Sequence, residues 1–472
     1  MGPVDHRGQG DDVPLAHPSV ELERPLVEQR PPGEQTPHGE RPRGQVVGLA
    51  EDPPPDGPAV EGDGDEGAGT ERRDGEEANM ADLVIRNAGT IVSGNIEAAL
   101  LEGDTVVVRD GRIAGVGADG DVDPSGIERE IDAAGATVFP GLIDSHVHPV
   151  LGDFTPRQRT LDFIDSYLHG GVTAMISAGE PHVPGRPKDP QGAKALAILA
   201  AKAFANARPS GVKVHAGALL LEKGLTEADF EELAEAGVRL VGEIGISGVA
   251  DQEEAERMTR WAQKVGMRVM VHMGGASIPG SSAIGADFVL TVKPDIAAHV
   301  NGGPTAPAVE DVERILGESD TAIEVVQCGN VRALRDVIQL ADREAALDRV
   351  LVGTDSPSGT GVIPLGVLRT LSWVSALGGV APEKAVAMAT GNTARLHGLD
   401  TGRIAEGAEA DLVIADAPRG SQASDALEAL AVGDTPAVAA VIIDGEARVS
   451  KSRNTPPPAR SVSVPWMKGG GH

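Results

Sequence analysis

Between residues 138 and 376 the chain alternates between two hydrophobic patterns. Short apolar runs, typical of strands buried on both faces, are each followed by a longer segment whose apolar residues recur with helical spacing. The runs predict strands at 138–148, 172–177, 212–218, 238–244, 268–272, 296–300, 322–327 and 350–353. The helical spacing predicts helices at 161–168, 193–207, 227–236, 252–264, 283–290 (the weakest), 309–316, 333–346 and 364–376.

This alternation favours an α/β fold with parallel strands, because every connection reaches the length of about a dozen residues that a parallel crossover needs. We therefore predict a (β/α)8 TIM-type barrel over residues 138–398, with functional residues at the carboxyl ends of its strands. An open doubly wound sheet is the alternative. It is less favoured because no G-x-G-x-x-G motif follows an early strand.

Strand patterns with tight turns flank this region on both sides. Asp110-Gly111 separates two apolar runs before it, and Asp444-Gly445 does the same after it. An Asp-Gly pair between such runs is a strong hairpin signal. We predict that residues 80–137 and 399–455 join into one small β-sandwich, with a loop-like tail at 456–472.

Residues 1–79 differ in composition from the rest of the chain. They contain no aromatic residue and 12 of the 34 prolines. Such a segment buries too little apolar surface to offset the entropy of ordering, so we predict a disordered extension. Met80 directly precedes the first strand pattern, which makes it an alternative start of the native protein.

Charge and cysteine content narrow the choice of partners and compartment. A formal net charge of −30 disfavours nucleic acid and anionic membrane surfaces, which call for clustered Lys and Arg. The single cysteine, Cys328, excludes an intrachain disulfide and is expected to be a small buried thiol. No apolar run approaches the length of a spanning helix, about 18 residues. We expect a cytoplasmic protein.

Candidate metal ligands lie where the predicted strands end. The first strand closes with His146 and His148, and residues i and i+2 of a strand point to the same face. Each residue alone fits a structural role, but a whole set at strand ends is hard to attribute to packing. Four imidazoles and two carboxylates are enough ligands for two divalent metals, with zinc, iron or manganese suited to N/O donors. The six residues are His146, His148, Glu243, His272, His299 and Asp355.

Longer motifs resemble the amidohydrolase superfamily. The opening signature is FPGLIDSHVH at 139–148, and the closing one is ATGNTARL at 389–396, continuing through GRIAEG at 402–407 to ADLV at 410–413. The resemblance covers nearly everything from Met80 onward. It implies that His146, His148 and Asp355 surround one metal and that His272 and His299 surround a second. A carboxylate bridge from Glu243 would join them, with a modified Lys213 as the less favoured alternative.

A closer likeness within the superfamily comes from PHVPGRPKD at 181–189, GASIPGSS at 275–282, HVNGGPT at 299–305 and DSPSGTG at 355–361. It implies a hydrolase of nicotinate breakdown that opens a cyclic enamide, 6-oxo-1,4,5,6-tetrahydronicotinate, to 2-formylglutarate with loss of ammonia. Two divalent ions, zinc or iron, and a homotetramer are implied as well. Asp355 would be the catalytic proton carrier. Candidate substrate contacts are Arg186, Lys188, His215 and Lys293, each of which also fits a structural or solvated role.

Two other functions remain open. The first is another cyclic-amide hydrolase of the superfamily, such as an imidase or a dihydroorotase-like enzyme. The second is a non-catalytic scaffold that has kept the barrel, which predicts missing ligands, whereas all six are present. A mononuclear deaminase is less favoured, because its His-x-x-Glu pair on the fifth strand has no counterpart after His272.

Overall fold

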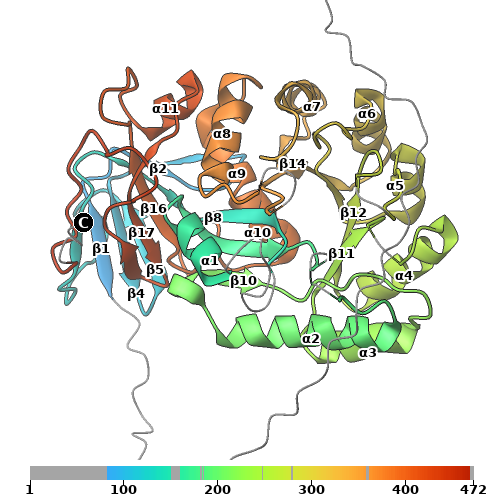
Figure 1. The fold of residues 1–472 in the computed structure, drawn as a ribbon. Coiled ribbons are helices and arrows are strands. Elements are labelled where there is room, and N and C mark those ends of the chain that lie inside the picture. The colour runs from blue at the N-terminus through green and yellow to red at the C-terminus, as the bar shows by residue number, and fades with distance from the viewer. Residues whose placement is uncertain are drawn as a thin grey trace, which may run out of the picture. The chain divides into compact units, whose positions relative to one another are not determined.

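A computed structural model describes residues 82–149, 160–180, 183, 185–246, 248–277, 280–357 and 361–467. The predicted disorder of residues 1–79 lies outside these ranges. From residue 142 to 376, strands and helices alternate in the predicted order (Figure 1). The strands are β8 (Leu142–Val147), β9 (Val172–Ser177), β10 (Lys213–His215), β11 (Leu240–Ile244), β12 (Arg268–His272), β13 (Ile296–Ala298), β14 (Ala322–Val326) and β15 (Val350–Gly353). The helices are α1 (Thr160–Leu168), α2 (Pro190–Asn206), α3 (Glu227–Glu235), α4 (Gln252–Lys264), α5 (Ala286–Val292), α6 (Val309–Glu318), α7 (Val331–Arg343) and α8 (Gly366–Ala376).

These strands form two parallel sheets, so the α/β prediction is confirmed. One sheet has the order β10-β9-β8 and the other β11-β12-β13-β14-β15. Isolated parallel bridges connect them at both edges, one from Leu219 to Val241 and one from Val147 to Ser356. Because neighbouring strands run parallel, their carboxyl ends meet at the same side of the sheets.

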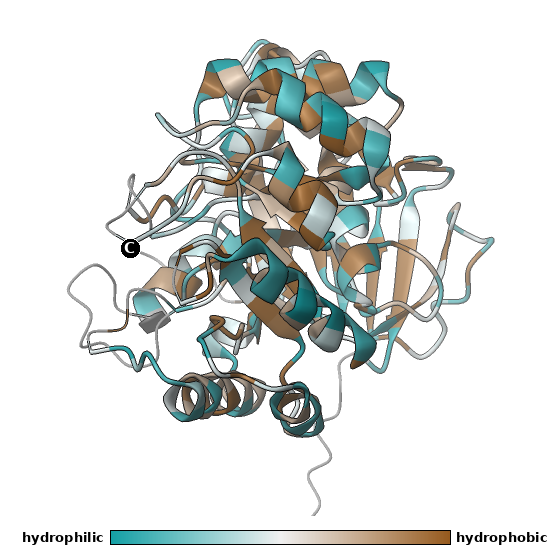
Figure 2. Ribbon diagram, turned by 90° about the vertical axis from the view of Figure 1, so that its right-hand side faces the viewer, coloured by the Kyte–Doolittle hydropathy of each residue, from teal (hydrophilic) through white to brown (hydrophobic). Residues whose placement is uncertain are grey.

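The helices form because capping residues and apolar stripes are placed correctly along the chain. Asn330 accepts hydrogen bonds from the first free amides of α7, and Asp251 does so for α4. In α7 the residues Leu334, Ile338 and Ala341 recur at helical spacing and are fully buried. Figure 2 shows the result, with hydrophilic and hydrophobic residues on different faces of the outer helices.

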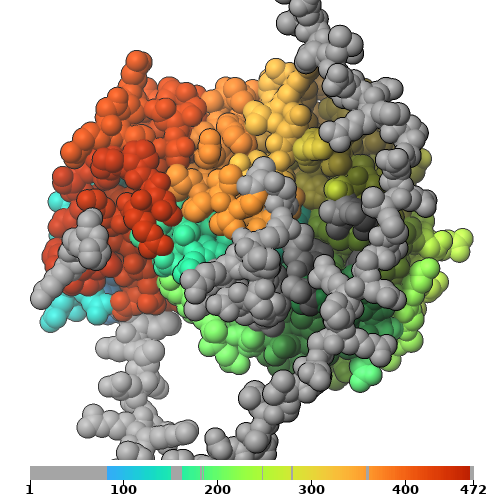
Figure 3. Space-filling model, viewed as in Figure 1, coloured from blue at the N-terminus to red at the C-terminus, as the bar shows by residue number. Residues whose placement is uncertain are grey.

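Strands from both ends of the chain build a second, two-sheet unit. Its strands are β1 (Leu83–Arg86), β2 (Thr90–Val92), β3 (Leu100–Leu101), β4 (Thr105–Arg109), β5 (Arg112–Gly117), β6 (Glu130–Asp132), β7 (Thr137–Pro140), β16 (Leu412–Asp416), β17 (Ala437–Ile443) and β18 (Glu446–Val449). The sheet orders are β5-β4-β1-β6 and β18-β17-β16-β7-β2-β3. One apolar core includes residues from both sheets, among them Ile85, Val108, Leu412 and Ile442. In Figure 3 the cyan early segment and the red late segment accordingly lie side by side.

Both predicted hairpins are present in this unit. Asp110-Gly111 connects β4 to β5, and Asp444-Gly445 connects β17 to β18, each between antiparallel strands. All four turn residues have positive φ, from 47° at Asp110 to 75° at Gly445, as a type I′ turn requires.

The prediction of one continuous strand at 138–148 was wrong. Thr137–Pro140 forms β7, which pairs with β16 and β2, whereas Leu142–Val147 forms β8, which pairs with β9. The break falls at Gly141, where a Cβ atom would lie 2.1 Å from Thr173 Oγ1. The chain therefore passes from the two-sheet unit to the parallel sheets within one residue.

The remaining helices and the tail complete the described chain. The tail packs on its own two-sheet unit, with Val464 in the core and Ser463 bridged to Asp132. Among the described helices, none is both long and apolar enough to span a bilayer. The remaining helices are α9 (Pro382–Met388), α10 (Gly391–His397), α11 (Ala426–Val432) and the 3-10 turns η1 (Pro209–Gly211) and η2 (Leu347–Arg349).

Candidate metal centre

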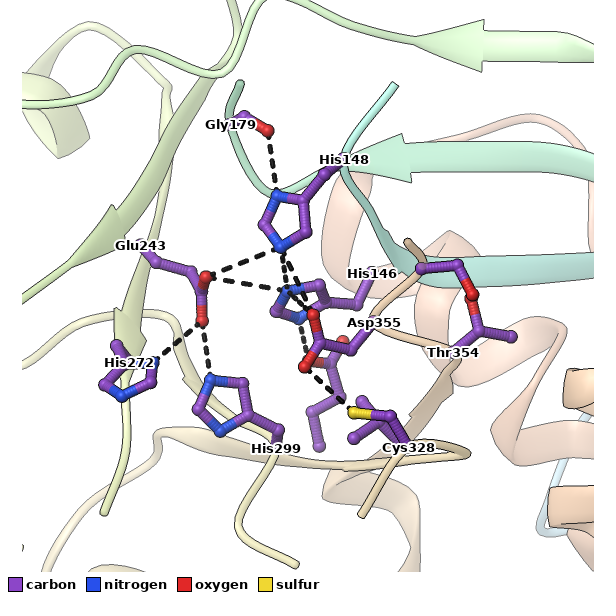
Figure 4. A network of polar contacts seen from close by, with 12 residues as sticks. His146, His148, Gly179, Glu243, His272, His299, Cys328, Thr354 and Asp355 are labelled. Atoms are coloured by element: carbon purple, nitrogen blue, oxygen red, sulfur yellow. Dashed lines mark hydrogen bonds and ion pairs between the residues drawn. The ribbon is translucent and has the colours of Figure 1, made fainter. Parts of the chain in front are cut away.

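Two histidines converge at the carboxyl end of β8 (Figure 4). His146 and His148 are two residues apart in extended backbone, so both imidazoles point to one side. Both rings are buried, and their Nε2 atoms lie 3.3 Å apart. Asp355, which follows β15, places Oδ1 3.2 Å from His148 Nε2 and 3.6 Å from His146 Nε2.

The hydrogen bonds made by Nδ1 of His146 and His148 determine whether each Nε2, which faces Asp355, carries a proton or a lone pair. His146 Nδ1 donates to Glu324 Oε2 at 2.6 Å, and His148 Nδ1 donates to the carbonyl oxygen of Gly179 at 2.9 Å. In the neutral rings each Nε2 therefore carries a lone pair. Two lone pairs and a carboxylate that face one another repel unless a cation lies between them. This donor set therefore fits a metal ion.

Glu243, at the end of β11, faces two pairs of histidines at once. Its Oε2 lies 3.7 Å from Nε2 of both His146 and His148. Its Oε1 lies 2.7 Å from His299 Nε2 and 3.6 Å from His272 Nδ1. Burial alone would raise the pKa of Glu243, but the facing rings of His146 and His299 hold it well below its usual value when they are protonated, and a cation between neutral rings would act in the same direction. The ionised carboxylate thus lies between two pairs of histidines, with one oxygen facing each pair.

His272, whose Nδ1 faces Glu243, likewise has its other ring nitrogen hydrogen-bonded to a main-chain carbonyl oxygen. Its Nε2 donates to the carbonyl oxygen of Gly275 at 3.2 Å, so Nδ1 carries the lone pair. This Nδ1 is buried and has no hydrogen-bond partner in the described part of the chain. An unpartnered acceptor beside a carboxylate is costly without a cation.

Two of the six residues have strained backbone. His299 has φ of 36° and Asp355 has φ of 56°, in the left-handed region that non-glycine residues rarely adopt. Such conformations cost on the order of 1–3 kcal/mol and concentrate at functional sites. Here they direct both side chains toward Glu243 and the β8 histidines.

All six predicted residues therefore come together in two adjoining groups. Within each group the potential ligand atoms lie within 4.8 Å of one another. The groups are His146, His148 and Asp355, and Glu243, His272 and His299.

The supporting residues were missed by sequence reasoning. Glu324 lies in the middle of β14 with no exposed surface and also accepts from Ser145 Oγ at 2.5 Å. A single carboxylate in an apolar strand was the signal that could have identified it. Asp144 accepts from the amide and the hydroxyl of Thr354, and burial raises its pKa to about 7. Cys328, expected to be a small buried thiol, is only half-buried and donates to Asp355 Oδ2 at 3.1 Å.

Two of the predicted substrate contacts lie on the loop after β9. Arg186 Nη1 donates to Glu222 Oε1 at 2.8 Å, and both side chains are largely buried. Arg186 is therefore not a solvated surface charge. Lys188 is exposed to solvent. Their role in substrate binding stays a prediction.

The other predicted contacts lie away from the six residues. Lys293 is exposed and precedes β13, so it lies at the opposite end of that strand from His299. His215 lines a cavity whose lining contains none of the six. The alternative bridging role of Lys213 was wrong, because its ammonium is bound by Glu409, Asp411 and Asp444.

Comparisons with known proteins give consistent matches. Residues 137–448 match the model of the amidohydrolase family. The chain is 54% identical to enamidase of Eubacterium barkeri over 385 residues, which is 82% of this chain and all of that protein. A crystal structure of enamidase superposes with a TM-score of 0.79 at 53% identity, covering 81% of this chain and all of that one. Adenine deaminase of Deinococcus deserti is 29% identical over 71% of this chain and 56% of its own length.

Proposed function

The chain belongs to the amidohydrolase family, and on that premise we propose that it is an enamidase, a hydrolase that opens the carbon–nitrogen bond of a cyclic enamide. The observation that carries the proposal is the 54% identity over the whole length of a known enamidase. The buried six-residue cluster supports it. The proposed substrate is 6-oxo-1,4,5,6-tetrahydronicotinate, and the products are 2-formylglutarate and ammonia.

The proposed architecture is a closed (β/α)8 barrel with a small β-sandwich made from both chain ends. The bridges Leu219–Val241 and Val147–Ser356 support closure, since they link the two parallel sheets at both edges. A homotetramer and a cytoplasmic location stay predictions, and light scattering on the purified protein tests the first.

Two divalent ions, zinc or iron, fit the two groups of ligands. His146, His148 and Asp355 would hold one ion, His272 and His299 the other, and Glu243 would contact both. Bound there, the ions supply a water of lowered pKa and polarise the amide carbonyl.

The protein's own residues handle the proton. Burial alone would raise the pKa of Asp355, but His146 and His299 in their protonated form and the hydrogen bond from His148 bring it to about 2. A cation held by the neutral rings would act in the same direction, so the carboxylate is ionised at neutral pH. Asp355 accepts a proton from the attacking water and delivers it to the ring nitrogen as the C–N bond breaks. The ring carbonyl carbon becomes a carboxyl group, and the freed nitrogen becomes the amino group of an enamine. A second water converts the enamine to the aldehyde with release of ammonia.

Metal analysis and turnover of the purified protein test the proposal together. We expect two metal ions per chain and conversion of the tetrahydronicotinate to 2-formylglutarate with ammonia in equal amount. A panel of lactams, imides and dihydroorotate run in parallel identifies another cyclic-amide hydrolase. A metal-free protein with no turnover of any of them indicates the non-catalytic scaffold.

A further inference from the structure

A cavity of about 500 Å³ is lined by residues of β10 and by Leu240 of β11, and its lining includes none of the six residues of the metal centre. These strands belong to different sheets, which the bridge between Leu219 and Val241 links. Residues with little or no side chain, Ala216, Gly237 and Gly266, are among those that line the cavity. The volume falls within the range of ligand pockets, roughly 300–1,000 Å³.

Three unpartnered ring nitrogens lie in this lining. His215 Nε2 and both nitrogens of His397 are buried without a hydrogen-bond partner in the described residues. Burial and the neighbouring cations lower the pKa of both histidines, that of His397 to about 3, so each ring is neutral and offers an N–H donor and an acceptor. Leaving such buried groups unpaired is costly, and a hydrogen-bonding ligand would recover that cost.

Arginines surround the entrance to the cavity. Arg239 and Arg268 are exposed neighbours, since the Arg268 amide donates to the Arg239 carbonyl at 2.9 Å. Arg268 pairs with Asp295, but Arg239 Nη1 donates only to main-chain carbonyls, and no carboxylate of the described chain lies within ion-pair distance of it. The charge of the Arg239 guanidinium is therefore available to an anionic ligand.

The two acidic residues of the lining are already neutralised. Lys213 binds Glu409 at 2.6 Å and Asp444 at 2.8 Å, and Arg208 binds Asp444 at 2.6 Å. The remaining wall is apolar, with Ile176, Phe204, Leu240 and Leu399. The cavity thus combines an apolar wall, neutral imidazoles and a guanidinium available at the rim.

We propose that this cavity is a second binding site, separate from the metal centre, for a small organic carboxylate with a flat apolar body. The carboxylate binds at Arg239 and Arg268, since a guanidinium matches a carboxylate in bidentate geometry. The body lies against Leu240 and Phe204, and polar atoms on its edge reach His215 and His397.

Isothermal titration calorimetry of the metal-loaded full-length protein with benzoate tests the proposal. Benzoate has a flat body and a carboxylate but no amide bond to hydrolyse. We expect saturable binding that weakens at least tenfold in the Arg239→Gln/Arg268→Gln double variant and in Ala205→Trp, which fills the entrance from α2. Arg260→Gln, an exposed arginine of α4 paired with Glu256, is the matched control and should bind as the wild type does.

Benzamide, which has the same shape without the charge, should bind at least tenfold more weakly than benzoate. Benzoate binding that persists in both cavity variants places it elsewhere, the metal centre included, and overturns the proposal. Absence of benzoate binding, or equal binding of benzamide, overturns it too. The arginine variants are at exposed positions, so the test stands even if Ala205→Trp fails to fold.

Discussion

The Nδ1 nitrogen of His146 lies 2.6 Å from Oε2 of Glu324, a carboxylate with no exposed surface in the middle of β14. This contact orients the ring and places its Nε2 lone pair toward His148 and Glu243. A carboxylate behind a histidine ligand also raises the basicity of the ring.

Glu324→Gln should weaken metal retention by roughly 10–100-fold. The neutral amide has a single acceptor oxygen for the hydrogen bonds from Ser145 and His146, and it lacks the negative charge of the carboxylate. Metal content after dialysis against increasing chelator measures this directly, without reference to turnover. Ser145→Ala removes the other partner of Glu324 and should have a smaller effect. Equal retention in Glu324→Gln and the wild type would refute the positioning role.

Asp355→Asn should reduce kcat by roughly 10²–10⁴-fold, since the amide cannot carry the proton from water to the leaving nitrogen. Single-turnover kinetics together with metal content separate lost chemistry from lost metal. Cys328→Ser keeps a donor next to Asp355 Oδ2 and should retain most of the activity. Normal turnover in Asp355→Asn would exclude its role as proton carrier.

Arg186→Gln should raise KM for the tetrahydronicotinate about tenfold if Arg186 binds the ring carboxylate, since each charge-assisted hydrogen bond contributes about 1.5–3 kcal/mol. Lys188→Gln, at an exposed position on the same loop, is the matched control and should leave KM unchanged. If Arg186→Gln lowers stability but leaves KM unchanged, Arg186 acts only through its ion pair with Glu222.

Lys213→Met should lower the free energy of unfolding by about 3–5 kcal/mol, because it leaves buried carboxylates without their cation. Lys213 lies 2.6 Å from Glu409 and 2.7 Å from Asp411, which has no exposed side-chain surface. Urea denaturation measures the change. Lys264→Met breaks the exposed pair with Glu227 and should cost far less. Similar losses of unfolding free energy in Lys213→Met and Lys264→Met would contradict the stabilising role of Lys213.

His397 should make stability depend on pH. Its pKa is about 3 in the folded chain, chiefly because of burial, against an ordinary value of 6.5. The unfolded chain binds the proton more readily, so stability is complete above pH 6.5 and falls as pH is lowered toward 3. At pH 5 the wild type should lose about 2 kcal/mol relative to pH 7.5, beyond any change in His397→Phe. Urea denaturation in buffers without carboxylates measures the difference, and parallel curves for the two proteins would exclude this role.

The pattern of apolar residues was sufficient to predict the order of strands and helices, because burial on one or both faces leaves a periodic signature in the chain. It was sufficient for the site as well. Residues at the carboxyl ends of parallel strands must meet, so His146, His148, Glu243, His272, His299 and Asp355 could be assembled from their positions alone. The Asp-Gly hairpins were equally local and were predicted correctly.

Only the tertiary structure could decide what depends on contacts between distant residues. The break at Gly141 depends on the pairing of β7 with β16 and of β8 with β9, neither of which the local pattern contains. Likewise, nothing in the sequence links Glu324 to His146, pairs Arg186 with Glu222, or turns His215 toward His397 in a cavity instead of toward the metal ligands. Periodicity records which residues are buried, whereas the partner of a buried polar group is set by how separate strands pack.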